Sequence, residues 1–506
     1  MVKIFIKNTN CKIVGSLSLA ALEALDKKMS YSFSGYQYMK GGRGGYGLSG
    51  KYGGWDGIFR LFTKSQTFPI GLLHIAESIL KDNGIPYTKI DSRSTPSYGK
   101  SLKIIDSNFK PRGYQLDIVK KCHKSGGGII RSATGSGKTS IIAMLAAKYN
   151  VKTVIYVIGI ELLYQMKSTI ENLYGLECGI VGGGKCELNK DVTIMTIWSA
   201  AAAFNKKCKL IDSDVTSDKA SLNKSLKKEE VRKKVNEAEL IMIDECQYAA
   251  SETVQFLHKE SHSARHRFLF SGTPWRDGGD DILIEAVGGP KIYDLNATKL
   301  IRKDYLVPPE IHFINVPPLR GVGKTYQEVY KNYIVDNPER NELIIKCARK
   351  LIKSGKKVLI LVVRVSHGNA LLEMIGEEFR AEFLDGKKNA NQRLQSIKDM
   401  KQGGLDILIA SKIFDQGIDI PELDALILAG SGKSSGRALQ RIGRVIRKNP
   451  GKKKAVVVEF FDNAKYLRDH SEKRIEVYKS EPGFKIIMPK NKVLHKYPKP
   501  KSVKWT

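Results

Sequence analysis

The sequence predicts an α/β protein in which a small N-terminal α+β domain precedes two tandem, doubly wound domains, each built on a parallel sheet. Two series of short, β-branched apolar runs alternate with helical stretches, the first between residues 128 and 270 and the second between residues 358 and 458. Strands that are buried on both faces of a parallel sheet have this composition. At 506 residues the chain has room for three or four domains. We therefore expect four segments, residues 1–100, 101–298, 299–465 and a basic extension at 466–506.

The N-terminal segment, residues 1–100, is rich in glycine and aromatic residues. Its first seven residues alternate in polarity like a strand, and residues 70–80 have the spacing of a helix that stops at Asn83-Gly84. The glycine run at 41–47 predicts a flexible, positively charged tip, and residues 91–99 have the composition of a linker. We expect this segment to fold as the α+β domain.

The overall charge narrows the classes of partner. The chain has 84 Lys and Arg residues against 52 Asp and Glu, a net charge of +32. This favours a polyanion, above all nucleic acid, over the alternative of a merely basic, soluble surface. No apolar run approaches the roughly 18 residues of a membrane span, and the N-terminus lacks a signal peptide's apolar core. Seven scattered cysteines without a C-x-x-C pair predict reduced intracellular thiols.

A glycine-rich loop follows the predicted strand at residues 128–130. Residues 132–139 read Ser-Ala-Thr-Gly-Ser-Gly-Lys-Thr, with Ser132 where the general phosphate-loop pattern has glycine. In that pattern backbone amides and the lysine hold the β- and γ-phosphates, and the final hydroxyl holds Mg²⁺. We therefore predict that ATP and Mg²⁺ bind at Thr134, Gly135, Ser136, Gly137, Lys138 and Thr139.

Two carboxylates, Asp244 and Glu245, directly follow the apolar run at 240–243. At the end of such a strand one carboxylate can orient Mg²⁺, and its neighbour can position and deprotonate the attacking water. The plain alternative is a solvated acidic pair, and the phosphate loop upstream argues against it. We predict Asp244 and Thr139 as the metal-binding residues.

Residues 440–447 read Gln-Arg-Ile-Gly-Arg-Val-Ile-Arg. Arg444 and Arg447 are spaced one helical turn apart, and such guanidinium groups can neutralise the charge on a transferring phosphoryl group. These arginines lie far from the phosphate loop in sequence, so they can belong to a different domain. ATP hydrolysis would then require both domains.

With these motifs in order, residues 108–465 resemble a superfamily 2 helicase, which implies that the two doubly wound domains are RecA-like. Tyr114-Gln115 resembles the adenine-reading Q motif, residues 132–139 are motif I, and residues 244–247 are motif II. Residues 271–274 resemble motif III, residues 415–419 with Gly417 and Asp419 resemble motif V, and residues 440–447 are motif VI. The resemblance implies a catalytic set of Lys138, Asp244, Glu245, Gln247, Gln440, Arg444 and Arg447.

The resemblance narrows to the UvsW-type phage helicases, which act on forks, Holliday junctions and displacement loops. It rests on Gly35-Tyr36, on Trp55 with its neighbours, on residues 323–328 and on residues 365–368. Gln247 departs from this pattern, because the close relatives have His there. Glutamine can still hydrogen-bond towards motif III, although it cannot become cationic.

The same resemblance implies contacts to the phosphates of one nucleic-acid strand. The expected residues in the motor domains are Gly182, Gly183, Gly184, Lys185, Thr196, Trp198, Ser411 and Lys412. A plain turn is the alternative for the three glycines, and a core position is the alternative for Trp198. In the N-terminal segment Arg43, Lys51 and Arg60 lie among aromatic residues, a composition suited to gripping a duplex arm.

These observations lead us to expect an ATP-dependent, Mg²⁺-dependent DNA helicase, monomeric on branched DNA, in the cytoplasm of a phage-infected cell. An RNA or RNA–DNA helicase and a nucleotide-dead DNA-binding module are the alternatives. The stretch at 200–237 has the composition of a Lys-rich insertion. His258, His262 and His266 recur every four residues on a predicted helix, which we expect to be solvated or to face DNA, since no complete metal shell surrounds them.

Overall fold

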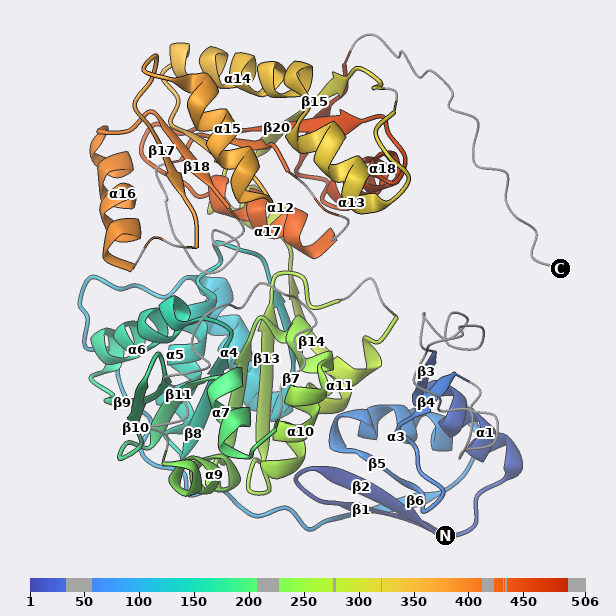
Figure 1. Ribbon diagram of the computed structural model, residues 1–506. Helices are drawn as coiled ribbons and strands as arrows, with labels where there is room; N and C mark the ends of the chain where they lie inside the picture. The colour runs from blue at the N-terminus through green and yellow to red at the C-terminus, as the bar shows by residue number, and fades with distance from the viewer. Residues whose placement is uncertain are drawn as a thin grey trace, which may run out of the picture. The chain divides into compact units, whose positions relative to one another are not determined.

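The computed structural model describes residues 1–32, 57–206, 227–275, 279–319, 321–386, 388, 390–411, 423–430, 432 and 435–489. These residues divide into two compact units, residues 1–300 and residues from 301 onward (Figure 1). Among them we find no helix with the length and apolar character of a membrane span.

The first unit begins with a four-stranded sheet in the order β5-β2-β1-β6. Alternate residues of β1 (Val2, Ile4 and Ile6) are buried, because one face of the sheet packs against helices. The elements are β1 (Val2–Ile6), β2 (Asn10–Val14), α1 (Leu19–Lys28), β3 (Ser30–Ser32), β4 (Ile58–Arg60), β5 (Thr67–Pro69), η1 (Ile70–Leu72), α3 (Leu73–Asp82) and β6 (Tyr87–Asp91). They form the α+β arrangement that the sequence predicts.

An eight-stranded sheet follows, in the order β10-β9-β11-β8-β12-β13-β7-β14, and its neighbouring strands are parallel except for β10 and β9. Its strands are β7 (Gly127–Ser132), β8 (Thr153–Val157), β9 (Cys178–Gly182), β10 (Lys185–Glu187), β11 (Val192–Thr196), β12 (Leu240–Asp244), β13 (His266–Ser271) and β14 (Lys291–Leu295). Its helices are α4 (Gly113–Ser125), α5 (Lys138–Tyr149), α6 (Ile160–Tyr174), α7 (Ile197–Ala203), α9 (Lys228–Glu237), η2 (Cys246–Ala250), α10 (Glu252–Glu260), α11 (Ile282–Gly288) and α12 (Ala297–Arg302). Every residue of β8 and β12 is buried, as expected of central parallel strands.

The second unit contains a seven-stranded parallel sheet in the order β17-β18-β16-β19-β20-β15-β21. Its strands are β15 (Pro309–Val316), β16 (Val358–Leu361), β17 (Ala381–Leu384), β18 (Ile407–Ala410), β19 (Ala425–Leu428), β20 (Ala455–Asp462) and β21 (Lys485–Ile487). Its helices are α13 (Tyr326–Val329), the π-helix η3 (Tyr330–Val335), α14 (Pro338–Lys353), α15 (Val365–Ile375), α16 (Ala390–Gln402), α17 (Ser435–Val445) and α18 (Leu467–Lys479). The predicted α/β fold, with two doubly wound parallel sheets behind a small α+β domain, is confirmed.

A buried seam joins the small N-terminal domain to the eight-stranded sheet. The guanidinium of Arg267, on β13, donates from Nη1 to the carbonyl of Asn8 and, at 2.6 Å, to that of Ala264. The Asn8 side chain in turn donates to the carbonyl of His262 at 2.8 Å. A Cβ at Gly71 would lie 1.9 Å from the carbonyl oxygen of Glu285 on α11, so only glycine fits there. The N-terminal domain therefore shares a closely packed interface with the first parallel sheet.

One expectation about local structure is wrong, and another stays a prediction. Val231 and Val235 of α9 are fully buried in the core of the first parallel sheet, and residues 207–226 of the expected insertion lie outside the described residues, so the insertion stays a prediction. The three histidines do not share a helix, because α10 ends at Glu260 and His266 begins β13. His258 and His266 are buried, and burial lowers the pKa of both. Helical spacing was misleading here because the helix ends between His258 and His262.

Candidate active site

The glycine-rich loop joins β7 to α5, and α5 begins at Lys138. Gly135 and Gly137 have φ angles of 86° and 78°, a region that favours glycine. Ser132 and Ser136 are buried, with their Oγ atoms 2.7 Å apart. Ser132, which replaces the usual glycine, therefore stabilises the loop through a buried contact with Ser136. Lys138 and Thr139 remain partly exposed at the helix N-terminus.

Tyr114 and Gln115, at the start of α4, contact this loop directly. The Tyr114 hydroxyl donates to the carbonyl of Ser136 at 2.8 Å, and Nε2 of Gln115 donates to the same carbonyl at 3.1 Å. Oε1 of Gln115 accepts the backbone N–H of Arg112 at 2.9 Å, and Nη1 of Arg112 donates to the Tyr114 hydroxyl at 2.8 Å. Both predicted residues are thus buried tethers of the phosphate loop, and contact with adenine stays a prediction.

Asp244 ends β12, and Glu245 follows it in a left-handed conformation with φ of 58°. The Glu245 backbone N–H donates to Oδ1 of Asp244 at 3.0 Å. Burial and the neighbouring Glu245 carboxylate raise the pKa of Asp244, whereas the Lys138 ammonium lowers it. Two carboxylates and a lysine from distant parts of the chain therefore share one electrostatic environment at the carboxyl edge of the sheet.

Gln247 connects this acidic pair to the end of the neighbouring strand. Its Nε2 donates to Oε2 of Glu245 at 3.1 Å, and its Oε1 accepts the hydroxyl of Ser271 at 2.7 Å. The Ser271 Oγ also lies 3.3 Å from Oε2 of Glu245 and accepts the backbone N–H of Thr273 at 3.0 Å. Glutamine at position 247 therefore makes the contact towards motif III. Ser271 was not among the predicted site residues, although its place at the end of β13 beside β12 could have indicated it.

Gln440, Arg444 and Arg447 belong to the second unit, whereas the residues above belong to the first. Gln440 and Arg444 are one turn apart on α17, which ends at Val445. Arg447 has left the helix and forms an isolated bridge with Leu306, so the expected one-turn spacing of the two arginines is wrong. Arg441, which the prediction omitted, is buried and donates to the carbonyl of Gly430 at 3.3 Å.

The residues of the first unit fit a nucleotide with a divalent cation. Two glycines in left-handed backbone, a helix N-terminus and Lys138 match what phosphate oxygens require. Asp244 carries a buried carboxylate whose charge a cation would stabilise, and Thr139 offers a hydroxyl. Elsewhere in the described part of the chain, no cluster of three or more His, Cys, Asp or Glu side chains could hold a metal.

The glycines expected to contact nucleic acid lie at the end of β9 and in the turn that follows it. Gly183 and Gly184, with φ angles of 59° and 78°, form a two-residue hairpin between β9 and β10, and Lys185 follows with its ammonium 5.5 Å from the Tyr164 ring centre. The turn alternative thus describes the glycines, while Lys185 stays exposed for a phosphate. Gly182 ends β9, where a Cβ would lie 2.9 Å from the Thr196 side chain.

Several of the other residues expected to contact nucleic acid make contacts within the fold, and their binding to nucleic acid stays a prediction. Thr196 is buried and its hydroxyl caps α7 by accepting the Ser199 N–H at 3.2 Å. Trp198 packs partly buried against the core, Arg60 pairs with Asp26 at 3.0 Å, and Ser411 is buried after β18. Arg43, Lys51, Lys412, Gly417 and Asp419 lie outside the described residues.

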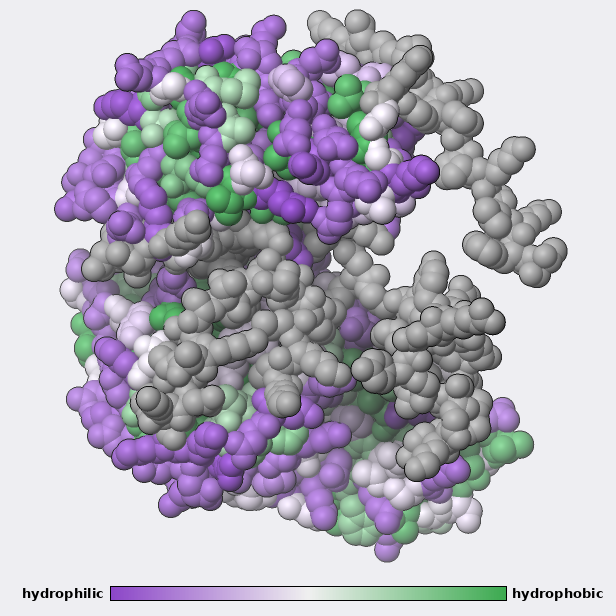
Figure 2. Space-filling view, in the orientation of Figure 1, coloured by the Kyte–Doolittle hydropathy of each residue, from purple (hydrophilic) through white to green (hydrophobic). Residues whose placement is uncertain are grey.

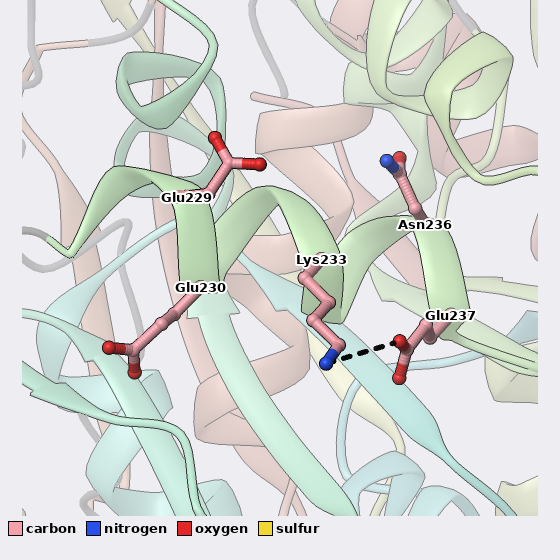
Figure 3. A pocket seen from close by; sticks show the side chains of 5 residues that line it. All are labelled: Glu229, Glu230, Lys233, Asn236 and Glu237. Atoms are coloured by element: carbon pink, nitrogen blue, oxygen red, sulfur yellow. Dashed lines mark ion pairs between the residues drawn. The ribbon is translucent and has the colours of Figure 1, made fainter.

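One surface hollow lies away from these residues. Glu229, Glu230, Lys233, Asn236 and Glu237 of α9 line it (Figure 3). Lys233 pairs with Glu237 at 3.8 Å, and none of the five is among the predicted site residues. We interpret it as the solvated face of α9.

The comparisons with known proteins agree with the fold and the motifs. Residues 108–276 match the family described as "Type III restriction enzyme, res subunit", and residues 340–449 match "Helicase conserved C-terminal domain", together more than half of the chain. The chain is a superfamily 2 helicase. It resembles the UvsW-type phage helicases, and it is an ATP-dependent DNA helicase.

Two relatives and one solved structure illustrate the match. "ATP-dependent DNA helicase uvsW" of Enterobacteria phage T4 is 24% identical over 486 residues, 87% of this chain and 91% of the relative. "DNA 3'-5' translocase XPB2" of Sulfurisphaera tokodaii is 24% identical over 395 residues, 70% of this chain and 82% of the relative. The structure of S. cerevisiae Dbp5 bound to RNA and ADP BeF3 has a TM-score of 0.51 at 15% identity, covers 75% of this chain and 90% of its own, and shows the fold alone.

Proposed function

We propose that this helicase is a Mg²⁺-dependent motor that unwinds or branch-migrates forks, Holliday junctions and displacement loops. It works as a monomer on DNA during the replication, recombination and repair of a phage, in the cytoplasm of the infected cell. The observation that carries the proposal is the match to the T4 uvsW helicase, which covers 87% of this chain and therefore reaches into the N-terminal segment. A relative matched only over the motor would not support a shared choice of substrate.

The proposed chemistry assigns one task to each group in the first unit. Lys138 and the loop amides hold the β- and γ-phosphates, and Tyr114 with Gln115 holds the loop in shape. Thr139 and Asp244 would bind Mg²⁺, which supplies positive charge to the phosphates when it is bound. The Lys138 ammonium lowers the pKa of Asp244 and the Glu245 carboxylate raises it, which supports assigning the loop and the acidic pair to one site.

Water activation falls to Glu245 in this proposal. Its carboxylate takes the proton of the attacking water, and Gln247 with Ser271 holds the carboxylate in one orientation. Arg444 and Arg447 neutralise the charge that spreads over the transferring phosphoryl group. Because these arginines belong to the other unit, ATP turnover would be coupled to movement of one unit against the other.

The test is a panel of four substrates at equal concentration: a linear DNA duplex, a fork, a Holliday junction and an RNA duplex. We expect ATP-dependent unwinding of the fork and the junction to exceed that of the linear duplex, with little activity on RNA. Equal rates on all DNA substrates would contradict the branched-DNA assignment. Preferred unwinding of RNA would show that the enzyme acts on RNA.

A further inference from the structure

A cluster of exposed cations, one exposed tyrosine and one partly buried tyrosine at the carboxyl edge of the second sheet has no role in the nucleotide chemistry above. It consists of Lys324, Tyr326, Arg364, Lys465 and Tyr466, which we call the α13–α18 surface. These residues follow β15, β16 and β20, whose carboxyl ends lie at the same edge because the strands are parallel. Ligands of open α/β sheets bind outside this edge.

Direct contacts hold the parts of the α13–α18 surface together. The Tyr466 hydroxyl donates to the carbonyl of Lys324 at 3.2 Å, and Nζ of Lys465 donates to the same carbonyl at 3.3 Å. The rings of Tyr326 and Tyr466 meet edge to face at 6.2 Å, and the Tyr326 ring is 5.6 Å from that of His470. In Figure 1, α13 and α18 accordingly lie side by side.

The backbone of Tyr466 is unusual for a large side chain. Its φ is 66°, in the left-handed region that residues other than glycine rarely occupy, and its side chain is 37% exposed. The surrounding contacts hold the Tyr466 ring at the surface although this strains the backbone. Strained backbone of this kind is concentrated at functional sites. The Lys465 ammonium lies 4.8 Å from the centre of this ring.

The charge of the α13–α18 surface is positive. Lys324, Arg364 and Lys465 are exposed, and across the described residues no ion pair joins any of them to an acid. The carboxylate of Glu328 accepts the backbone amides of Lys324 and Thr325 at 2.8 and 3.1 Å, so it fixes the loop. Side chains over α13 and α18 are mostly hydrophilic in Figure 2.

We propose that the α13–α18 surface binds a single strand of DNA. The three cations pair with successive phosphates, and the exposed ring of Tyr466 receives a base, the combination by which proteins hold single strands without reading sequence. A net charge of +32 favours a polyanion over an acidic protein patch as the occupant. The inference rests on the proposed function and adds a strand contact in the second unit.

The test compares two double variants of equal charge, Lys324→Gln/Lys465→Gln and Lys353→Gln/Lys479→Gln. Lys353 and Lys479 are exposed lysines at the ends of α14 and α18, outside the surface. Binding of fluorescent single-stranded DNA is measured by anisotropy over a range of salt concentrations. Loss of two phosphate contacts should reduce the salt slope by about 1.4 in the first double variant, and the control should keep the wild-type slope.

Tyr466→Ala should weaken single-strand binding about 5- to 150-fold through lost stacking, whereas Tyr466→Phe should keep most of the affinity. The inference is overturned if the two double variants behave alike, or if only duplex affinity falls. Stimulation of the wild-type ATPase by DNA is measured in parallel. This measurement distinguishes a failure of the proposed helicase function from a failure of the α13–α18 surface as a strand-binding site. A wild type without stimulation contradicts the proposed function, and a stimulated wild type with unchanged variants contradicts the α13–α18 surface alone.

Discussion

Replacing Gln247 with leucine tests whether the side chain that distinguishes this motif II positions Glu245. The variant Gln247→Leu keeps the size of the side chain and removes the 3.1 Å donor to Oε2 of Glu245. A hydrogen bond to a charged group contributes about 1.5–3 kcal/mol, which corresponds to a factor of about 10 to 150 in rate. In this variant the Ser271 hydroxyl loses its acceptor on Gln247 and can donate to the same Glu245 oxygen, 3.3 Å away, so we expect the lower end, a fall in kcat of about tenfold.

The assay is steady-state ATP hydrolysis at saturating DNA, with kcat and KM determined separately and the melting temperature recorded. Gln255→Leu is the matched control, because Nε2 of Gln255 donates to two backbone carbonyls, of Ala249 and Leu283, each at 2.7 Å, away from Glu245. It should lower the melting temperature and leave kcat unchanged. Gln247→His, which introduces the residue implied by the resemblance to the UvsW-type helicases, should keep kcat within a few-fold. A normal kcat in Gln247→Leu would refute the positioning role.

Three further outcomes follow from the site and the core. Lys138→Ala should abolish ATP turnover and leave DNA binding largely intact, since DNA affinity rests on many cations; a parallel loss of DNA binding in anisotropy would contradict this. Arg444→Ala and Arg447→Ala should each lower kcat by about 10³-fold with a smaller effect on KM, whereas a change in KM alone would point to ground-state binding. Burial lowers the pKa of His367 to about 3, and its Nε2 lies 2.9 Å from Oδ1 of Asn341. Between pH 7 and pH 5 His367 becomes protonated in the unfolded chain but stays neutral in the folded chain. The free energy of unfolding should therefore fall by about 2 kcal/mol over this range. Denaturant titrations at the two pH values should show a decrease smaller by this amount in His367→Gln.

Local sequence was sufficient for the sheets and for the nucleotide loop. The apolar runs that end at Asp244 and Ser132 became interior strands of the first parallel sheet, because a strand covered on both faces tolerates little else. The two glycines before Lys138 have the left-handed backbone that the pattern requires. The strands and the loop depend mainly on residues that are adjacent in the sequence, so they can be predicted from one sequence.

Contacts between distant segments were not predicted. Gln115 lies 21 residues from Ser136, and its contact with the loop depends on how α4 packs beside β7. The hydrogen bond from Arg267 to the carbonyl of Asn8 joins residues 259 positions apart in the sequence. Without this contact, the N-terminal segment was predicted to be a more independent domain than the structure shows. Arg447 left its helix because its backbone pairs with Leu306, which no helical periodicity can indicate. Packing and pairing across the chain determined each of these.

The central claim is that ATP hydrolysis at Glu245 drives the remodelling of branched DNA. The most direct test is Glu245→Gln, measured for ATP binding, ATP turnover and Holliday-junction unwinding in one buffer. The amide keeps the hydrogen-bonding shape but cannot take the proton of water. The account predicts near-normal ATP binding, very slow turnover and no unwinding, with the protein held on the junction. Near-normal turnover, or unwinding that persists without turnover, would contradict it.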